Sequence, residues 1–425
     1  MITTQLRALR RRVAVTGWGA ITPLGLGVDE TWSAMLAGRS GIRPVQAFDV
    51  TDLNTRIAGE VRGFDPNRYI PRKTSRQMDT YSQYAMAAAL EAVESAKLVV
   101  DEQLGPRVGV LIGSGYGPVN YNHAVAERLR TKGPRGVSPY AQVAGAIDHA
   151  AGQISMHFGA RGPSKAISTA CATGADSVGE AARWIQFGVV DVAIAGGAEN
   201  CLTRVDLAGS GNARVLSSRN DEPELASRPF DEDRDGFVMS AGAGVLILED
   251  AEHAQDRGAP ILAEVVGYGA TSDAYHWTAP HPDGTGEKAA MRQALDDAGL
   301  RPHHIDYVNA HATGTPLGDE IEVRSIREVL GAGATRIPVS STKSMTGHMS
   351  GAGGAVELIV CGLAIRDGVA PPTINCVRPL DPGMNFVPGT PQEHTIDVAM
   401  SNSFAFGGHN AVVILRRWVS KRNRS

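Results

Sequence analysis

One cysteine of the chain stands in a sequence that suits a reactive thiol. Cys171 lies in the run STACATGA, residues 168–175, among small neighbours at the predicted start of a helix. Small neighbours leave a path for a substrate, and a helix N-terminus directs backbone N–H groups and a positive dipole towards the sulfur, which favours the thiolate. A free cysteine is more often a small buried apolar residue. The run alone leaves both interpretations open.

Two histidines far downstream favour the chemical interpretation. His311, in the sequence NAHATGT, follows a predicted strand at 305–309, and His348, at the end of STKSMTGH, follows a predicted strand at 337–340. In α/β folds the loops after strands usually carry the chemistry. A cysteine with two histidines suits acyl transfer from a thioester, because a thiolate accepts the acyl group while imidazoles act on carbonyl and carboxylate groups.

The elements that would position these residues form a duplicated α/β chain. Apolar and small-residue patterns predict strands at 13–16, 108–112, 190–195 and 245–248 and a helix at 84–96. The sequence VVGYGA at 265–270 resembles VTGWGA at 15–20, and a turn-rich joint precedes it. We therefore predict a flexible N-terminal extension (1–12) and two packed α/β halves, 13–258 with the cysteine and 259–425 with both histidines.

Composition excludes several classes of protein. The chain has 425 residues and a net charge of −4, which argues against an overall basic, nucleic-acid-binding surface. Its four cysteines are far apart and show no zinc-type spacing, so we expect reduced thiols in a cytoplasmic protein without a bound metal. No apolar run approaches the ~20 residues that cross a bilayer. We therefore expect neither nucleic acid nor a membrane as a partner.

Two short motifs resemble ligand-binding loops but fail at one position each. Residues 17–22 (GWGAIT) nearly match the dinucleotide fingerprint, yet a threonine occupies the third glycine position. Residues 231–236 (DEDRDG) begin like a calcium-binding loop, but Gly242 stands at the twelfth position, where a bidentate glutamate is required. We predict instead that the acidic run forms a structural charge network with Arg228 and Arg234.

Four motifs, in order along the chain, together resemble the signatures of β-ketoacyl-acyl carrier protein (ACP) synthases. They are TAC at 169–171, NAHATGT at 309–315, KSMTGH at 343–348 and NSFAFGGHN at 402–410. The resemblance is to elongating enzymes of type II fatty-acid and polyketide synthesis. It implies the thiolase fold, an α/β fold in which two similar βαβαβαββ halves form α/β/α/β/α layers. It also implies an acyltransferase with no metal or organic cofactor, whose substrates are carried on the phosphopantetheine of acyl carrier protein.

The resemblance gives a role to each residue of the predicted catalytic site. Cys171 would attack an acyl-ACP thioester and hold the acyl chain. The backbone N–H groups of Cys171 and Phe406 would form the oxyanion hole, and Phe406 would also act as a gate. His311 and His348 would donate hydrogen bonds to the enolate that forms when malonyl-ACP loses carbon dioxide.

Three further residues have a structural interpretation beside the functional one. Lys343 would act through its charge, or would only hold Glu322 or Asp319 in an ion pair. Thr313 and Thr315 would bind the pantetheine arm, or would serve only the structure of their loop.

Carrier protein is acidic, so the resemblance also implies a basic docking patch. The residues at the family's docking positions are Lys73, Arg76, Arg135 and Arg214. Ordinary solvated surface charge is the other interpretation of each.

Particular positions separate this chain from other relatives. Thiolases use a second cysteine, and initiating and chalcone-type synthases an asparagine, where this sequence has His348. Chain-length factors lack the nucleophile, so Cys171 argues against a catalytically silent subunit. Ala405 stands where elongating synthases commonly have glycine, which restricts the backbone freedom of the gate loop. Ser210 replaces a bulky phenylalanine of the acyl pocket in fatty-acid enzymes, which suggests a long, rigid or unsaturated acyl chain.

These departures, with the arginine-bearing N-terminal extension, favour type II polyketide elongation in a heterodimer with a chain-length-factor subunit. The alternative is a housekeeping fatty-acid β-ketoacyl-ACP synthase II, which would be a homodimer. A second alternative is a catalytically silent, ketosynthase-like assembly subunit that shapes the pocket of a partner.

Overall fold

The computed structural model describes residues 10–420, which form a ten-stranded mixed sheet. The strand order is β10-β9-β13-β14-β8-β1-β7-β6-β4-β5. The strands are β1 (Val13–Ile21), β4 (Val108–Gly113), β5 (Ser164–Lys165), β6 (Val192–Glu199), β7 (Gly242–Asp250), β8 (Ala263–Ser272), β9 (Tyr307–Asn309), β10 (Val339–Ser340), β13 (Val398–Phe404) and β14 (His409–Arg416). Parallel pairs lie at both ends of the sheet, and antiparallel pairs form its middle.

The sheet consists of two halves with the same topology. In the first half the order is β1-β7-β6-β4-β5, and in the second it is β8-β14-β13-β9-β10. The halves meet where β1 pairs with β8, from Val13 opposite Val265 to Val15 opposite Ala263. The two similar sequences, VTGWGA and VVGYGA, lie on these equivalent strands. The predicted duplication is confirmed.

Glycine recurs in both sequences because a helix lies directly on each strand. A Cβ on Gly17 of β1 would come within 2.3 Å of the Ala92 carbonyl oxygen on α4 (Thr80–Ser95). A Cβ on Gly267 of β8 would lie equally close, 2.3 Å, to the Ala294 carbonyl oxygen on α12 (Thr285–Ala298). Because packed interiors leave no room for such an atom, any larger residue would push the helix away from the sheet.

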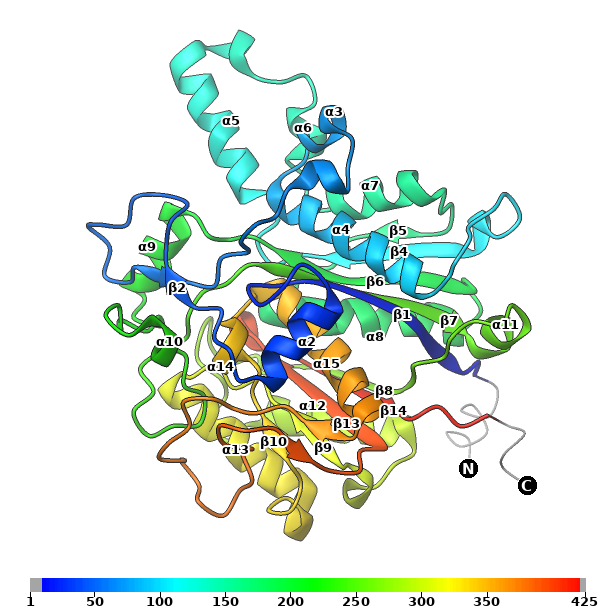
Figure 1. Ribbon diagram of the computed structural model, residues 1–425, viewed down its shortest axis with the longest axis vertical. Helices are drawn as coiled ribbons and strands as arrows, with labels where there is room; N and C mark the ends of the chain where they lie inside the picture. Colours follow the sequence, from blue (N-terminus) through cyan, green and yellow to red (C-terminus); the bar gives the residue numbers. More distant parts are fainter. Residues whose placement is uncertain (1–9, 421–425) are drawn as a thin grey trace.

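The helices form three layers around the two halves of the sheet (Figure 1). α4 and α7 (His149–Phe158) cover the outer face of the first half, and α12, with α13 (Pro316–Leu330) beside it, covers that of the second. α8 (Thr173–Gln186) and α15 (Gly353–Asp367) pack against each other between the halves. This is the predicted α/β/α/β/α arrangement.

Further helices and two small sheets surround these layers. The other helices are α2 (Val28–Leu36), α3 (Arg72–Ser75), α5 (Val119–Lys132), α6 (Ala141–Ala144), α9 (Arg204–Asn212), α10 (Pro223–Ala226), α11 (Ala251–Asp256) and α14 (Lys343–Thr346). Two small sheets pair β2 (Arg43–Pro44) with β3 (Ile57–Ala58) and β11 (Val369–Ala370) with β12 (Gln392–Glu393). α5 projects from the body of the molecule (Figure 1).

Residues 1–9 of the predicted flexible extension lie outside the described residues. The last three residues of the extension are held on the body by ion pairs of 2.7 Å each: Arg10 with Asp297, Arg11 with Asp191 and Arg12 with Glu264. The turn-rich joint between the halves connects α11 to β8. Within residues 10–420, no helix has both the length and the apolar character needed to cross a membrane.

Candidate active site

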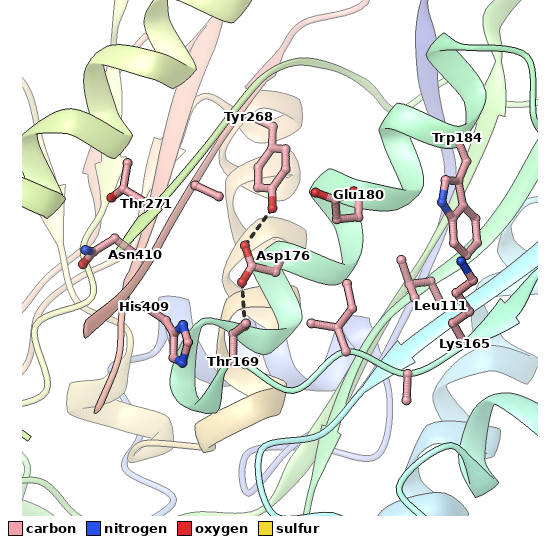
Figure 2. A pocket seen from close by; sticks show the side chains of 13 residues that line it. Leu111, Lys165, Thr169, Asp176, Glu180, Trp184, Tyr268, Thr271, His409 and Asn410 are labelled. Carbon is pink, nitrogen blue, oxygen red and sulfur yellow. Dashed lines mark hydrogen bonds between the residues drawn. The ribbon is translucent and has the colours of Figure 1, made fainter. Parts of the chain in front are cut away.

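Cys171 lies at a sharp backbone turn between the edge strand β5 and α8. Ala170, directly before it, has a φ of +49°, a left-handed conformation that costs a non-glycine residue about 1–2 kcal/mol. The turn is held by the Thr169 backbone N–H, which donates to Oγ1 of Thr173 at 2.8 Å. The Thr169 hydroxyl donates to Oδ2 of Asp176 at 2.5 Å (Figure 2). The turn places Cys171 just before α8, where its sequence predicts a helix start.

The second half of the chain brings both predicted histidines to this turn. Nε2 of His348 lies 2.9 Å from Sγ of Cys171. The rings of His311 and His348 are nearly perpendicular, with their centroids 5.3 Å apart. His311 follows β9, as predicted. His348 follows α14 rather than β10 directly, because the segment after β10 turns into this short helix.

Both imidazoles are neutral in this environment. Burial lowers the pKa of His348 to about 3 and that of His311 well below its usual value, and the charge of Lys343 acts in the same direction. Nδ1 of each ring is buried and has no hydrogen-bond partner among the described residues. No contact at Nδ1 therefore holds either ring in one tautomer.

The sulfur of Cys171 is also governed by burial. Loss of hydration raises the pKa of Cys171 to about 12, and it outweighs the lowering by the Lys343 charge and by the Phe406 backbone N–H. The backbone N–H groups at the helix start favour the thiolate, as expected, but burial outweighs them in the resting structure. The resting group is a thiol, and Nε2 of His348 lies where it can take the thiol proton.

Lys343 forms an ion pair with a residue that its motif does not contain. Its side chain is 2% exposed, and the ammonium group pairs with Glu357 on α15. Neither Glu322 nor Asp319 pairs with it, so the predicted structural ion pair with those residues is wrong. Glu357 takes their place because α15 runs between the halves and carries this one carboxylate in an otherwise apolar, buried run, within reach of Lys343. A charged residue in an apolar run indicates that it has a buried partner, but it does not say which residue that partner is.

Glu322 and Asp319 instead hold the loop of His311. The Glu322 carboxylate accepts hydrogen bonds from the backbone N–H groups of His311 at 2.8 Å and Ala312 at 2.6 Å. Asp319 accepts that of Gly314 at 3.1 Å. Burial raises the pKa of Glu322 to about 7 and that of Asp319 to about 6, against the effect of these hydrogen bonds. Both residues therefore belong to a structural network, as predicted, but as acceptors for the backbone.

The loop of Phe406 closes one side of the site. The Phe406 backbone N–H is directed at the sulfur of Cys171 and lowers its pKa. The next N–H, of Gly407, donates to the carbonyl oxygen of Trp277 at 2.7 Å. Ala405 has an extended backbone, with φ −124°. Any residue adopts this conformation, so the resting loop does not require glycine there.

These groups open into one cavity of about 460 Å³. Cys171, His311, His348 and Phe406 line it together with Thr313, Thr315 and Arg214. Ser210 lies on α9 and does not line this cavity. Of the other residues predicted to dock carrier protein, Lys73 and Arg76 lie at α3 and Arg135 in the turn after α5, all exposed and none of them on the cavity wall.

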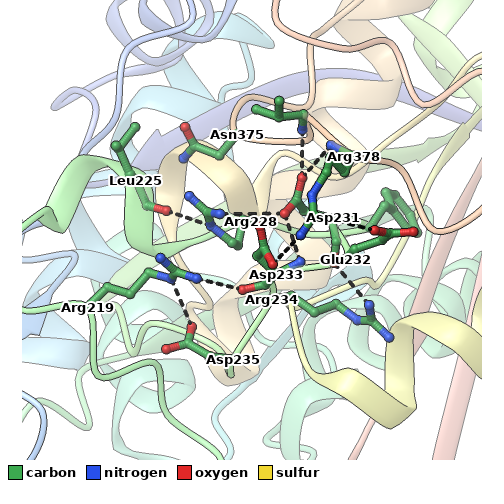
Figure 3. A network of polar contacts seen from close by, with 12 residues as sticks. Arg219, Leu225, Arg228, Asp231, Glu232, Asp233, Arg234, Asp235, Asn375 and Arg378 are labelled. Atoms are coloured by element: carbon green, nitrogen blue, oxygen red, sulfur yellow. Dashed lines mark hydrogen bonds and ion pairs between the residues drawn. The ribbon is translucent and has the colours of Figure 1, made fainter.

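The acidic run 231–236 forms the predicted charge network (Figure 3). Arg228 pairs with Asp231 at 3.5 Å. Arg234 donates to the carbonyl oxygens of Asp231 at 3.0 Å, Thr315 at 3.1 Å and Pro316. The network thus anchors the loop that lines the mouth of the cavity. Residues 10–420 contain no cluster of three or more histidine, cysteine or acidic side chains able to hold a metal ion.

Two further buried carboxylates near the site were missed by the sequence prediction. Glu199, at the end of β6, accepts the Gly115 backbone N–H at 2.7 Å and that of Gly351 at 3.1 Å, which joins loops of the two halves. Glu287, on α12, is 1% exposed and lines the cavity. Acidic residues between small or apolar neighbours were the available signal, but their contacts depend on the packing of distant loops.

Comparison with known families covers both halves. The model of the β-ketoacyl synthase N-terminal domain matches residues 10–254, and that of the C-terminal domain matches residues 262–377. Cys171 lies in the first range, and His311 and His348 lie in the second. This chain belongs to the β-ketoacyl synthase family. It is thus an acyltransferase of the condensing class.

Relatives extend over nearly the whole of this β-ketoacyl synthase. The 3-oxoacyl-[acyl-carrier-protein] synthase 2 of Vibrio cholerae is 48% identical over 411 residues, which are 96% of this chain and 99% of that protein. The synthase of the same name from Coxiella burnetii is 46% identical over 410 residues, again 96% and 99%.

Solved structures of ketosynthases have the same fold. The ishigamide ketosynthase/chain length factor matches with a TM-score of 0.88 at 37% identity, over 96% of this chain and 100% of that one. A type II polyketide ketosynthase bound to a hexaketide in complex with its acyl carrier protein, AntDE:AntF, has the same TM-score of 0.88 and the same coverage at 32% identity. These neighbours have the thiolase fold, and so has this chain.

Proposed function

We propose that this enzyme joins malonyl-ACP to an acyl chain held on Cys171, by decarboxylative Claisen condensation in fatty-acid elongation. The observation that carries the proposal is the 2.9 Å contact between Nε2 of His348 and Sγ of Cys171 at a shared cavity wall. His311 lies on the same wall with a neutral ring. A thiol, a proton acceptor and a second N–H donor are the groups that the two half-reactions need.

In the first half-reaction Cys171 takes the acyl group from acyl-ACP. The sulfur attacks the thioester carbonyl carbon as its proton passes to Nε2 of His348. The carbonyl oxygen becomes an oxyanion held by the backbone N–H groups of Cys171 and Phe406, and the loss of one such donor costs about 3 kcal/mol. The intermediate collapses to acyl-Cys171, and the leaving pantetheine sulfur takes the proton back from His348.

In the second half-reaction malonyl-ACP loses its carboxylate. The bond between the carboxylate and the α-carbon breaks, and carbon dioxide leaves. The electron pair of that bond forms an enolate, whose oxygen accepts hydrogen bonds from the ring N–H groups of His311 and His348. Either ring can present the required N–H, because its Nδ1 has no fixed partner in the described chain. The enolate carbon attacks acyl-Cys171, the carbon–sulfur bond breaks, and the Cys171 thiolate takes a proton from solvent. No cofactor takes part in either step.

Residues around the cavity would orient these substrates. Thr313 and Thr315 line the cavity, and their hydroxyl groups would bind the pantetheine arm. Arg214 lines the same cavity and, with the exposed Lys73, Arg76 and Arg135, would attract the acidic carrier protein. Lys343 would keep both histidines neutral through its charge.

The pathway is inferred from the relatives. Identity is 46–48% to curated 3-oxoacyl-[acyl-carrier-protein] synthases 2 and 32–37% to the two ketosynthases of the structural comparison. This favours the fatty-acid enzyme, as a homodimer, over the polyketide enzyme that Ser210 and Ala405 suggested. The polyketide enzyme remains the second candidate, because the structural neighbours include ketosynthases paired with chain length factors. A silent subunit has no support from a site that keeps Cys171 and both histidines.

Two experiments test the proposal and separate its candidates. Purified enzyme should release 3-oxoacyl-ACP from acyl-ACP and malonyl-ACP, and His311→Ala should abolish decarboxylation while leaving acylation of Cys171. The enzyme expressed alone should be a homodimer that extends saturated acyl chains once per encounter. A strict requirement for a co-expressed chain-length-factor subunit would favour the polyketide enzyme, and absence of decarboxylation would refute both.

A further inference from the structure

A chain of side-chain hydrogen bonds ends two residues before Cys171 (Figure 2). The Tyr268 hydroxyl donates to Oδ1 of Asp176 at 2.8 Å, and the Thr169 hydroxyl donates to Oδ2 of the same carboxylate at 2.5 Å. Asp176 lies in the first turn of α8 and is 7% exposed. Both of its oxygens are therefore used to tie the loop before Cys171 to β8 of the second half.

Tyr268 is itself held firmly on α8. A Cβ on Gly179 would come within 2.3 Å of the tyrosine ring. The ring therefore packs directly on the helix backbone, and only glycine leaves room for it there. The Tyr268 backbone N–H donates to Asp297 at 3.0 Å. Arg183 pairs with the same Asp297 at 2.9 Å, and its guanidinium lies 5.7 Å from the centroid of the Tyr268 ring. The hydroxyl thus reaches Asp176 from a fixed position.

The loop that this chain holds is strained. Ala170, between Thr169 and Cys171, has a φ of +49°. Such a conformation persists only where the surrounding structure fixes it. If Thr169 lost its side-chain anchor, the turn would relax and Sγ would move relative to Nε2 of His348. A shift of about 1 Å in a reacting atom is enough to slow a reaction by about 100-fold.

We propose that Asp176, fixed by Tyr268, is a positioning residue for Cys171. It acts through Thr169 on the turn at Ala170 and so sets the sulfur against His348 and the oxyanion donors. The inference rests on the proposed function, because it assigns Asp176 to the acylation half-reaction. Decarboxylation of malonyl-ACP uses the histidines and does not depend on where the sulfur lies.

The test separates these two half-reactions in substituted enzymes. Asp176→Asn keeps the volume but offers one acceptor oxygen to two hydroxyl donors, and Thr169→Val removes the donor. Thr169→Ser keeps the hydroxyl. Glu180→Gln is the matched control, because it also changes a carboxylate to an amide on α8 at the same pocket, but on an exposed side chain that does not contact Thr169. Each variant is assayed for acylation from acyl-ACP, decarboxylation of malonyl-ACP, alkylation by iodoacetamide and thermal unfolding.

We expect Asp176→Asn and Thr169→Val to slow acylation of Cys171 at least about tenfold, with decarboxylation within about threefold of wild type. Thr169→Ser and Glu180→Gln should stay near wild type in both. Unchanged acylation in Asp176→Asn, or an equal fall of both reactions, would overturn the inference. If wild-type enzyme neither acylates nor decarboxylates, the proposed function fails. In that case the rates of iodoacetamide alkylation of Cys171 test the inference by themselves, and an alkylation rate in Asp176→Asn equal to that of wild type overturns it.

Discussion

Nε2 of His348 lies 2.9 Å from Sγ of Cys171, although the two residues are 177 positions apart in the chain. The two residues come from opposite halves of a duplicated fold, and they meet where the turn at 170–172 packs against the turn at 350–352, just after His348. Since burial keeps His348 neutral and Cys171 protonated, the pair rests as imidazole and thiol. The reactivity of the cysteine therefore depends on proton transfer during attack rather than on a preformed thiolate.

The pH dependence of alkylation follows from this resting state. Iodoacetamide reacts with the thiolate, and the pKa of Cys171 is raised to about 12. Below that pKa the thiolate fraction rises with pH, so the alkylation rate should rise about tenfold per unit from about pH 6 to about pH 9. Mass spectrometry of the Cys171 peptide gives the rate. A plateau near neutral pH would show a thiolate–imidazolium pair and contradict the neutral resting state.

Lys343 and Glu357 should depend on each other for stability. Lys343→Met leaves a buried carboxylate without its counter-charge, so the free energy of unfolding should fall by about 3–5 kcal/mol. The double variant Lys343→Met/Glu357→Gln removes the charge as well and should recover most of that loss. Urea unfolding followed by circular dichroism measures both. Equal destabilisation in the single and double variants would mean that the ion pair is not the cause.

Glu322 should affect decarboxylation through the position of His311. Glu322→Gln leaves one acceptor oxygen for the backbone N–H groups of His311 and Ala312, which now share it with Asn402. Decarboxylation of malonyl-ACP should fall at least about tenfold, while acylation of Cys171 is retained. Glu320→Gln, an exposed change on the same helix, is the control. A fall of similar size in the control would assign the effect to the helix instead.

Arg234 should affect substrate binding more than turnover. Its guanidinium holds the Thr315 and Pro316 carbonyl groups at the mouth of the cavity, and lysine cannot reproduce this planar fork. Arg234→Lys should therefore raise KM for malonyl-ACP about tenfold with little change in kcat. Arg228→Lys alters the same charge network, but its side chain bonds to Leu225 and Asp231 rather than to that loop, so it should leave KM unchanged. Steady-state kinetics compares the two, and equal effects would contradict the anchoring role.

Much of the fold could be predicted from the sequence, because strands, helix starts and repeated glycines depend on residues that are close together in the chain. The repeated glycines on β1 and β8 reveal the duplication, because each of these strands needs glycine where a helix packs against it. The helix start at Cys171 was likewise predicted from the residues around it. His311 and His348 could be proposed from their loops, and their meeting at Cys171 came from the family resemblance.

Long-range electrostatics could not be predicted in this way. The partner of Lys343 is Glu357 because α15 passes between the halves, and no spacing in the sequence encodes that contact. The pKa of Cys171 is raised because burial outweighs the helix N-terminus, and burial is a property of the assembled layers. Ser210 was assigned by register alone, and it lies on α9 away from the cavity wall of Cys171.

The mass of the Cys171 peptide through one reaction cycle tests the central claim most directly. Enzyme mixed with acyl-ACP should gain the mass of one acyl group on Cys171, and addition of malonyl-ACP should remove it as carbon dioxide and 3-oxoacyl-ACP appear together. Enzyme that remains unmodified on Cys171 while 3-oxoacyl-ACP accumulates, or that keeps its acyl group after malonyl-ACP is added, would contradict the account.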